Sequence, residues 1–214
     1  MNPKLPYTSN PEAYLDFLQL ILKTVAQRDR NPQIVYSLLQ ANLDKLDEFL
    51  AHVLQAWALS TLPQADPEIA RAITEIIVSF CILLKQFPLG DKASHLEAII
   101  TGHEIASNVF TRKEFPRDWG IAQNNLGNAY LYRIHGDRAE NLEMAIAYFR
   151  RALQVRTPEA FPTSWAITQN NLGEAYRNRI LGDPAENLEV AIAAFQSALQ
   201  VFTLEEFPLD WATA

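Results

Sequence analysis

The chain has 214 residues, of which 49% are apolar, and a net charge of −7. This acidic balance argues against a nucleic-acid partner, because phosphates require a basic surface. The sequence shows no apolar stretch long enough to span a bilayer, so we expect no membrane contact and a cytoplasmic location. The single cysteine, Cys81, excludes an intrachain disulfide and fits a reducing compartment.

The first part of the chain contains three pairs in which Asn or Asp precedes proline. Each pair is typical of a helix start, with the polar residue as N-cap and the proline in the first turn. The three pairs begin at Asn10, Asn31 and Asp66. They predict helices near 11–28, 32–61 and 67–87. Whether the middle helix breaks near Asn42 is left open by the sequence.

A 46-residue repeat follows. Phe115-Pro116 recurs as Phe161-Pro162 and again as Phe207-Pro208, and residues 115–160 and 161–206 are identical at 30 of 46 positions. Such self-similarity is the signature of a repeat architecture. We expect an N-terminal helical cap at 1–66, a degenerate repeat at 67–114, full repeats at 115–160 and 161–206, and the start of a further repeat at 207–214.

Each copy is predicted to form two helices. Proline suits the first helical turn, so the first helix should open at Pro116 or Pro162. Apolar residues then recur at steps of three and four, and no alternation typical of a strand is found. The fold is therefore predicted to be all-α. The expected helix-end residues are C-caps at Gly136 and Gly182, N-caps at Asp137 and Asp183, and capping-box partners at Glu140 and Glu186.

The repeat resembles the tetratricopeptide repeat (TPR) family. Its small-residue pattern is met by Leu126-Gly127, Tyr130, Ala145, Phe149 and Ala152, and again 46 residues later. The motif Asn-Asn-Leu-Gly resembles one found in kinesin-light-chain repeats. It also resembles one in bacterial repeat arrays that are attached to caspase-like (CHAT) protease domains. The resemblance implies a right-handed superhelical solenoid of antiparallel helix pairs. It also implies a scaffold or adaptor that binds a protein or peptide, as the recognition part of a larger signalling or protease protein.

In the resembled family, the first helix of each pair lines a concave binding face. Structural residues should recur between copies, whereas residues that select a ligand should differ. The differing pairs on the first helix are Asn128 and Glu174, Leu131 and Arg177, and Tyr132 and Asn178. The recurring Asn124 and Asn170 could contact a peptide backbone or tie neighbouring helices, and we favour peptide contact. For Asn125 and Asn171 the two roles are equally balanced.

Other recurring residues are expected to be structural. Trp119 and Trp165 should lie in the core, and Arg133 and Arg179 should pair with a nearby carboxylate. Cys81 stands where later copies have Gly127, so we expect a buried thiol and not a nucleophile.

The sequence does not suggest an enzyme. Its four histidines have no spacing typical of a metal site, and there is no phosphate-binding glycine loop. We therefore expect no catalytic residue, no metal and no cofactor. The alternative function is self-assembly, in which Phe195 and Leu199 at an open C-terminal edge form a homodimer.

Overall fold

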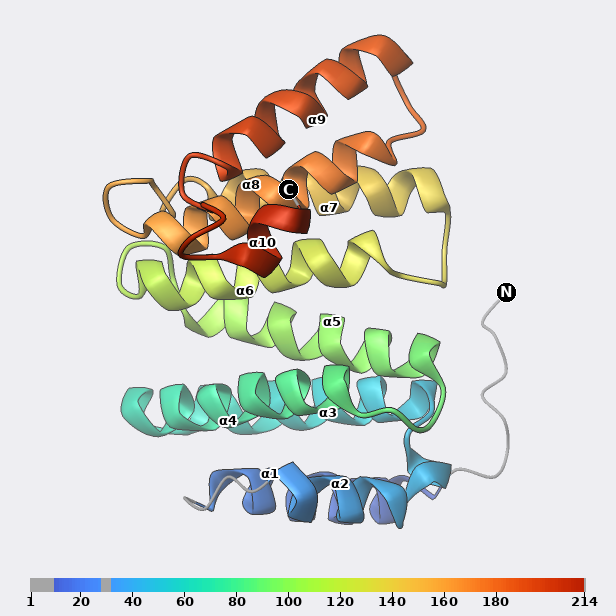
Figure 1. The fold of residues 1–214 in the computed structure, drawn as a ribbon. Helices are drawn as coiled ribbons and strands as arrows, with labels where there is room; N and C mark the ends of the chain where they lie inside the picture. The colour runs from blue at the N-terminus through green and yellow to red at the C-terminus, as the bar shows by residue number, and fades with distance from the viewer. Residues whose placement is uncertain (1–9, 28–31, 214) are drawn as a thin grey trace. The chain divides into compact units, whose positions relative to one another are not determined.

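The computed structural model describes residues 10–27 and 32–213 (Figure 1). These residues fall into two compact units, which divide between Val109 and Phe110. Within these ranges the regular structure is helical and contains no strand, so the all-α prediction is confirmed. The expected cap residue Asn31 lies outside the described residues. No helix in the described ranges is both long and apolar enough to cross a bilayer.

The first unit consists of five α-helices in its described part. They are α1 (Pro11–Ala26), α2 (Pro32–Gln40), α3 (Glu48–Thr61), α4 (Pro67–Gln86) and α5 (Lys92–Val109), with short 3-10 turns at Leu43–Lys45 and Leu62–Gln64. Helix α1 packs against α3 and α4, and α5 packs against the same two helices. Asn10 caps α1 as predicted, with its side chain accepting a hydrogen bond from the backbone N–H of Glu12.

The helix expected at 32–61 is broken between α2 and α3, at the place the sequence left open. The side chain of Asn42 donates a hydrogen bond to the carbonyl of Leu38 at 2.9 Å. A new helix then starts at Asp47, whose carboxylate accepts from the N–H of Phe49 at 3.0 Å. Short polar side chains compete with the helix for backbone groups, and here they end one helix and cap the next.

The contact between α4 and α5 depends on small residues. Cys81 is buried, as predicted, and its Sγ fills the space that a Cβ at Gly102 would need. His103 follows on α5 and is also buried, at the position where the two later copies have Phe149 and Phe195. The degenerate copy thus keeps the close helix packing with a different set of side chains.

The second unit contains the two full repeats. Its helices are α6 (Pro116–Leu131), α7 (Arg138–Ala152), α8 (Pro162–Arg177), α9 (Pro184–Ala198) and the short α10 (Pro208–Thr213). Helix α6 pairs with α7 and α8 pairs with α9, and α7 packs against α8 (Figure 1). The predicted helix starts at Pro116 and Pro162, and the two-helix content of each repeat, are confirmed.

Each pair closes around a glycine and a phenylalanine. A Cβ at Gly127 would lie 2.5 Å from the ring of Phe149, and one at Gly173 would lie 2.8 Å from the ring of Phe195. Contacts this short are not tolerated, so only glycine allows the two helices to approach. Phe195 packs against Gly173 inside its own pair, but it is only partly buried, whereas the equivalent Phe149 is fully buried. The expectation that Phe195 lies at an open C-terminal edge stays a prediction. Trp165 is only partly buried, against the cluster around Phe202.

The turns between paired helices need a left-handed residue. Gly182 has a φ of +83°, but α8 has already ended at Arg177, so this glycine is part of the turn and not the C-cap we expected. Gly136 behaves in the same way. Directly after Gly182, the carboxylate of Asp183 accepts from the N–H groups of Ala185 and Glu186 at 2.8 and 3.0 Å. The predicted N-cap role of Asp183 is confirmed, as is that of Asp137.

Burial of His103 should make the first unit sensitive to acid. Burial lowers the pKa of His103 from 6.5 to about 4, so the unfolded chain binds a proton at a higher pH than the folded one. Stability should therefore fall as the pH drops from about 6.5 to 4, by about 2–3 kcal/mol from this residue. Burial also lowers the pKa of His95, so this residue too should reduce the stability of the folded state as the pH falls.

Urea unfolding between pH 7.5 and 4.5 measures this loss. His103→Leu should flatten the pH dependence, whereas His52→Leu, at an exposed position, should leave it unchanged. An equal pH dependence in the wild type and in His103→Leu would contradict the prediction.

Candidate functional site

The candidate site is the surface of the neighbouring first helices, α6 and α8. Asn124 lies between them with only 5% of its surface exposed. Its Oδ1 accepts from Asn171 Nδ2 at 3.2 Å and lies 3.1 Å from the Thr168 hydroxyl. Both partners belong to α8, so Asn124 and Asn171 join the two helices. Of the two roles left open by the sequence, the geometry supports the tie between helices for these residues.

Asn170 has the same place in the second repeat as Asn124 has in the first. Its Oδ1 is buried, yet it has no hydrogen-bond partner among the described residues. The amide oxygen that joins two helices in one repeat is thus left without a donor in the next. Asn128 and Asn125 are partly exposed and both contact Asn124. The side chain of Asn128 donates to the Asn124 carbonyl, and the Oδ1 of Asn125 lies 3.5 Å from the Nδ2 of Asn124.

The residues that differ between copies gather at the C-terminal ends of α6 and α8. The hydroxyl of Tyr132 donates to Glu174 Oε1 at 2.9 Å, and Asn178 donates to the Glu174 carbonyl at 2.8 Å. Burial and the neighbouring Glu174 raise the pKa of Tyr132 to about 12, while the charge of Arg177 opposes this shift. Tyr132, Arg177 and Asn178 are exposed. These side chains form an acidic, basic and aromatic surface that solvent can reach.

Leu131 does not belong to this surface. Its side chain is buried, and its carbonyl accepts a hydrogen bond from Arg138. An apolar side chain gains free energy by leaving water, and no ligand can contact it in this arrangement. The expectation of a binding role for Leu131 is therefore corrected.

A buried arginine lies beneath the same surface. Arg156 is 7% exposed, and its Nη1 donates to the Thr168 hydroxyl at 2.9 Å and to the Ser164 carbonyl at 3.3 Å. Burial lowers its pKa to about 10. A Cβ at Gly120 would lie 3.6 Å from Arg156 Nε and 2.8 Å from a methyl of Val155. The glycine thus makes room mainly for Val155, and Arg156 would be in ordinary contact with an added Cβ.

Three residues around Arg156 differ from their equivalents in the other copy of the repeat. Where the first copy has Gly120 the next has Ala166, and where the second has Thr168 the first has Ala122. Arg156 stands between Phe110 and Phe202, 46 residues away on either side. In the following copy Phe202 packs against Ala166 and Ala198, so the ordinary packing is apolar.

Sequence reasoning missed this cluster because it compared only the exposed face of the first helix. The same comparison over all 46 positions would have included Gly120, Thr168 and Arg156 among the 16 positions that differ.

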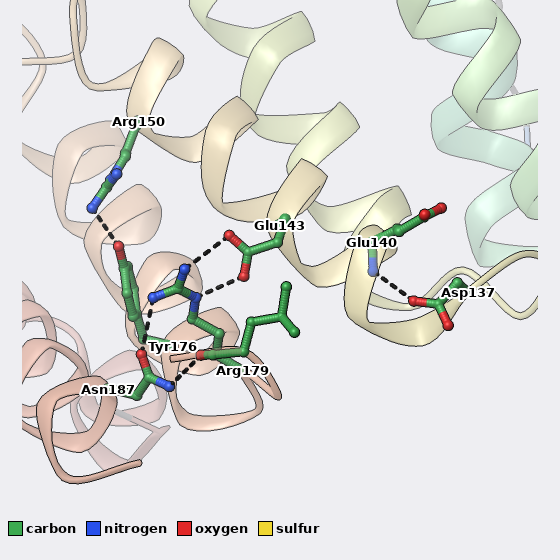
Figure 2. Close-up of polar contacts among 8 residues, drawn as sticks. Asp137, Glu140, Glu143, Arg150, Tyr176, Arg179 and Asn187 are labelled. Atoms are coloured by element: carbon green, nitrogen blue, oxygen red, sulfur yellow. Dashed lines mark hydrogen bonds and ion pairs between the residues drawn. The ribbon is translucent and has the colours of Figure 1, made fainter. Parts of the chain in front are cut away.

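Arg179 joins three segments of the second unit (Figure 2). Its Nε and Nη2 donate to the two carboxylate oxygens of Glu143 on α7, at 2.7 and 3.0 Å, and its Nη1 donates to Asn187 on α9 at 3.1 Å. Its guanidinium also lies over the ring of Tyr176, whose hydroxyl accepts from Arg150. The prediction that Arg179 pairs with a carboxylate is confirmed. Planar two-point pairing of this kind fixes orientation as well as distance.

Reactive groups are not brought together in the described ranges. Burial raises the pKa of the Cys81 thiol to about 12, which disfavours the thiolate. No group of three or more His, Cys, Asp or Glu side chains is placed to hold a metal ion in the described part of the chain. The α6–α8 surface presents charged, amide and aromatic side chains.

Comparisons with known proteins gave no match, whether to protein-family models, to curated proteins or to solved structures.

Restoring the ordinary repeat residues around Arg156 should stabilise the protein. We expect the double variant Arg156→Phe, Thr168→Ala to raise the free energy of unfolding by about 1–3 kcal/mol, because apolar packing replaces a desolvated charge. Gly120 is kept, because a Cβ there would lie 2.8 Å from Val155. Arg156→Ala alone should lower the free energy of unfolding, because it leaves a void and removes the hydrogen bonds. Urea unfolding measures both, and a double variant less stable than the wild type would contradict the prediction.

The pair of Arg179 and Glu143 should show a measurable coupling. In a double-mutant cycle with Arg179→Ala and Glu143→Ala, we expect about 1–2 kcal/mol, above the usual value for a surface pair because the contact is two-point and partly buried. The exposed pair Arg71 and Glu75 on α4 is the control and should give less than about 0.5 kcal/mol. Equal coupling energies for the two pairs would show that the two-point geometry adds nothing.

Proposed function

We propose that the chain is a protein- or peptide-binding module of the TPR type, whose ligand lies along the surface of α6 and α8. The observation that carries this proposal is the hydrogen bond from Tyr132 to Glu174. It places the residues that differ between copies side by side on neighbouring helices, where solvent reaches them.

Recurring and differing residues support this proposal in complementary ways. The recurring Asn124 and Asn171 hold α6 and α8 at a fixed separation. The differing residues lie above them and carry no packing role that would be the same in each copy. A rigid base with variable side chains on top is how repeat proteins present a binding surface.

The chemistry of the surface indicates the kind of ligand. Glu174 and Arg177 present opposite charges, Tyr132 presents an aromatic ring, and the amides of Asn128 and Asn178 can donate and accept. A polypeptide segment with at least one charged side chain meets these groups, with the amides contacting its periodic backbone. We place the peptide-binding role on these residues, and we place Asn125 at the edge of the site.

The wider role follows from the resemblance of the repeats. We propose a right-handed solenoid that acts in the cytoplasm as a non-enzymatic adaptor, the recognition part of a larger signalling or CHAT-protease-type protein. The close glycine–phenylalanine packing in both pairs supports the TPR-type helix hairpin within this proposal.

Selection of peptides on the full chain tests the proposal. Peptides from a random 12-residue display library should bind the wild type and lose at least about tenfold in affinity for the double variant Arg177→Glu, Asn178→Asp, because charge and amide donors are removed from the surface. Fluorescence anisotropy with the selected peptides measures this loss.

Lys113→Glu serves as the matched control, because it reverses an exposed positive charge in the loop before α6. It should leave the affinity within about twofold. Selected peptides that bind the double variant and the wild type equally well would contradict a ligand site on α6 and α8.

A further inference from the structure

Arg156 is a buried cation to which the described residues supply no anion. It is 7% exposed, and its hydrogen bonds go to the Thr168 hydroxyl and the Ser164 carbonyl, which are both neutral. Burial is the cause of its lowered pKa, and no carboxylate lies close enough to oppose that shift. Removing a charge from water is costly, and the usual compensation is an opposite charge. Arg156 is therefore an unbalanced charge inside the second unit.

One edge of the Arg156 guanidinium is unused. Both hydrogen bonds leave from Nη1, and neither Nε nor Nη2 has an acceptor among the described residues. Neither atom belongs to the buried side-chain atoms of the described chain that lack a partner, so solvent reaches this edge. A Cβ at Gly120 would lie 3.6 Å from Nε. The absence of a side chain at Gly120 thus keeps the Nε–Nη2 edge clear on the side of α6.

The same edge of another arginine shows what it can bind. Nε and Nη2 of Arg179 donate to the two carboxylate oxygens of Glu143, at 2.7 and 3.0 Å. A guanidinium edge and a carboxylate are both planar, and their two parallel hydrogen bonds fix orientation as well as distance. Arg156 presents the same two donors without the carboxylate.

The position of Arg156 on α8 also favours an anion. Ser164 lies in the first turn of α8, and Thr168 lies one turn further along. The N-terminal end of a helix carries a partial positive charge, which disfavours a cation and favours an anion. The first turn of α8 contains no acidic residue, and its N-cap residue Phe161 makes no side-chain hydrogen bond. Two positive groups therefore meet here, and neither is neutralised by the first turn of α8.

The equivalent positions in the other copies have no such need. Phe110 and Phe202 occupy them, and both side chains are buried. Phe110 packs against Phe115, and Phe202 packs against Phe207, at ring distances of 5.9 and 5.6 Å. The unbalanced charge thus belongs to the contact between the two full repeats.

We propose that Arg156 is a carboxylate-binding site, in which Nε and Nη2 donate to the two oxygens of one carboxylate. The carboxylate fits because its single negative charge balances one guanidinium and its coplanar oxygens match the two donors. It comes either from a small free acid or from an acidic side chain of the peptide in the proposed function. The site itself does not depend on that function, because the contacts of Arg156 define it.

Side-chain NMR of the full chain tests the site. In ¹⁵N-labelled protein, the Nε–H signal of Arg156 should shift saturably on titration with sodium acetate, with sodium chloride keeping the ionic strength constant. The signal is assigned through the backbone, so this titration needs no variant. Arg150 is the matched control, because it is exposed and donates to the Tyr176 hydroxyl. Its signal should shift far less, since a solvated guanidinium binds a carboxylate weakly.

Arg156→Lys separates the two-point edge from charge alone. Replacing chloride by about 50 mM acetate should raise the Tm of the wild type by about 2–4 °C, because the ligand binds the folded state. In Arg156→Lys the rise should be less than about half of this, because an ammonium lacks the planar pair of donors. An Arg156 signal that does not respond to acetate, or equal Tm rises in the two proteins, would overturn the proposal.

Peptides distinguish the two sources of the carboxylate. If a side chain of the ligand occupies the site, exchanging the acidic residues of a selected peptide for amides should weaken binding to the wild type about fivefold or more. The same exchange should change the affinity for Arg156→Gln by less than about twofold. Unchanged affinities together with a saturable acetate shift would identify a free acid as the ligand. Failure of the peptide selection would count against the proposed function alone, since the acetate titration decides the carboxylate site.

Discussion

The structure of each repeat depends on the contact between a glycine of the first helix and a phenylalanine ring of the second. The ring of Phe149 lies where a Cβ at Gly127 would have to be, so the helix axes can approach only if that side chain is absent. A hydrogen bond or a charge pair at this position could be lost and leave the helices paired. Loss of the glycine would force them apart, because packed interiors leave no room for another carbon atom.

The contacts between repeats add polar, directional bonds to the apolar packing of α7 against α8. Asn124 and Glu143 each accept from α8 or the turn that follows it, and these bonds set the position of one pair relative to the next. Apolar packing within pairs gives stability, and polar contacts between pairs fix their relative position. Arg156 adds a desolvated cation to the polar contacts between the two full repeats. One repeat later the equivalent residue is Phe202, so the chemistry at that position is different.

Much of the fold could be predicted from the sequence, because its signals are local. Proline at the first turn and aspartate at the N-cap act within a few residues, and the identity of 30 of 46 positions indicates that the two segments fold alike. The candidate site was harder to predict from the sequence. The burial of Asn124 and Leu131 depends on neighbouring helices, which no window along the chain contains. The break at Asn42 depended on which backbone groups its side chain would take, and composition does not decide that.

The cluster of Gly120, Arg156 and Thr168 has a consequence for how such a gene can change in length. Gain or loss of 46 codons by recombination between copies would preserve every contact inside a pair, since both copies supply the same glycine and phenylalanine. It would not preserve this cluster, whose members come from both sides of the junction. Removing 161–206 would put a single alanine, that of position 214, in the place of Thr168, and removing 115–160 would leave Thr168 without the guanidinium of Arg156. The order of the two copies therefore matters to this cluster, because its contacts form only when 115–160 directly precedes 161–206.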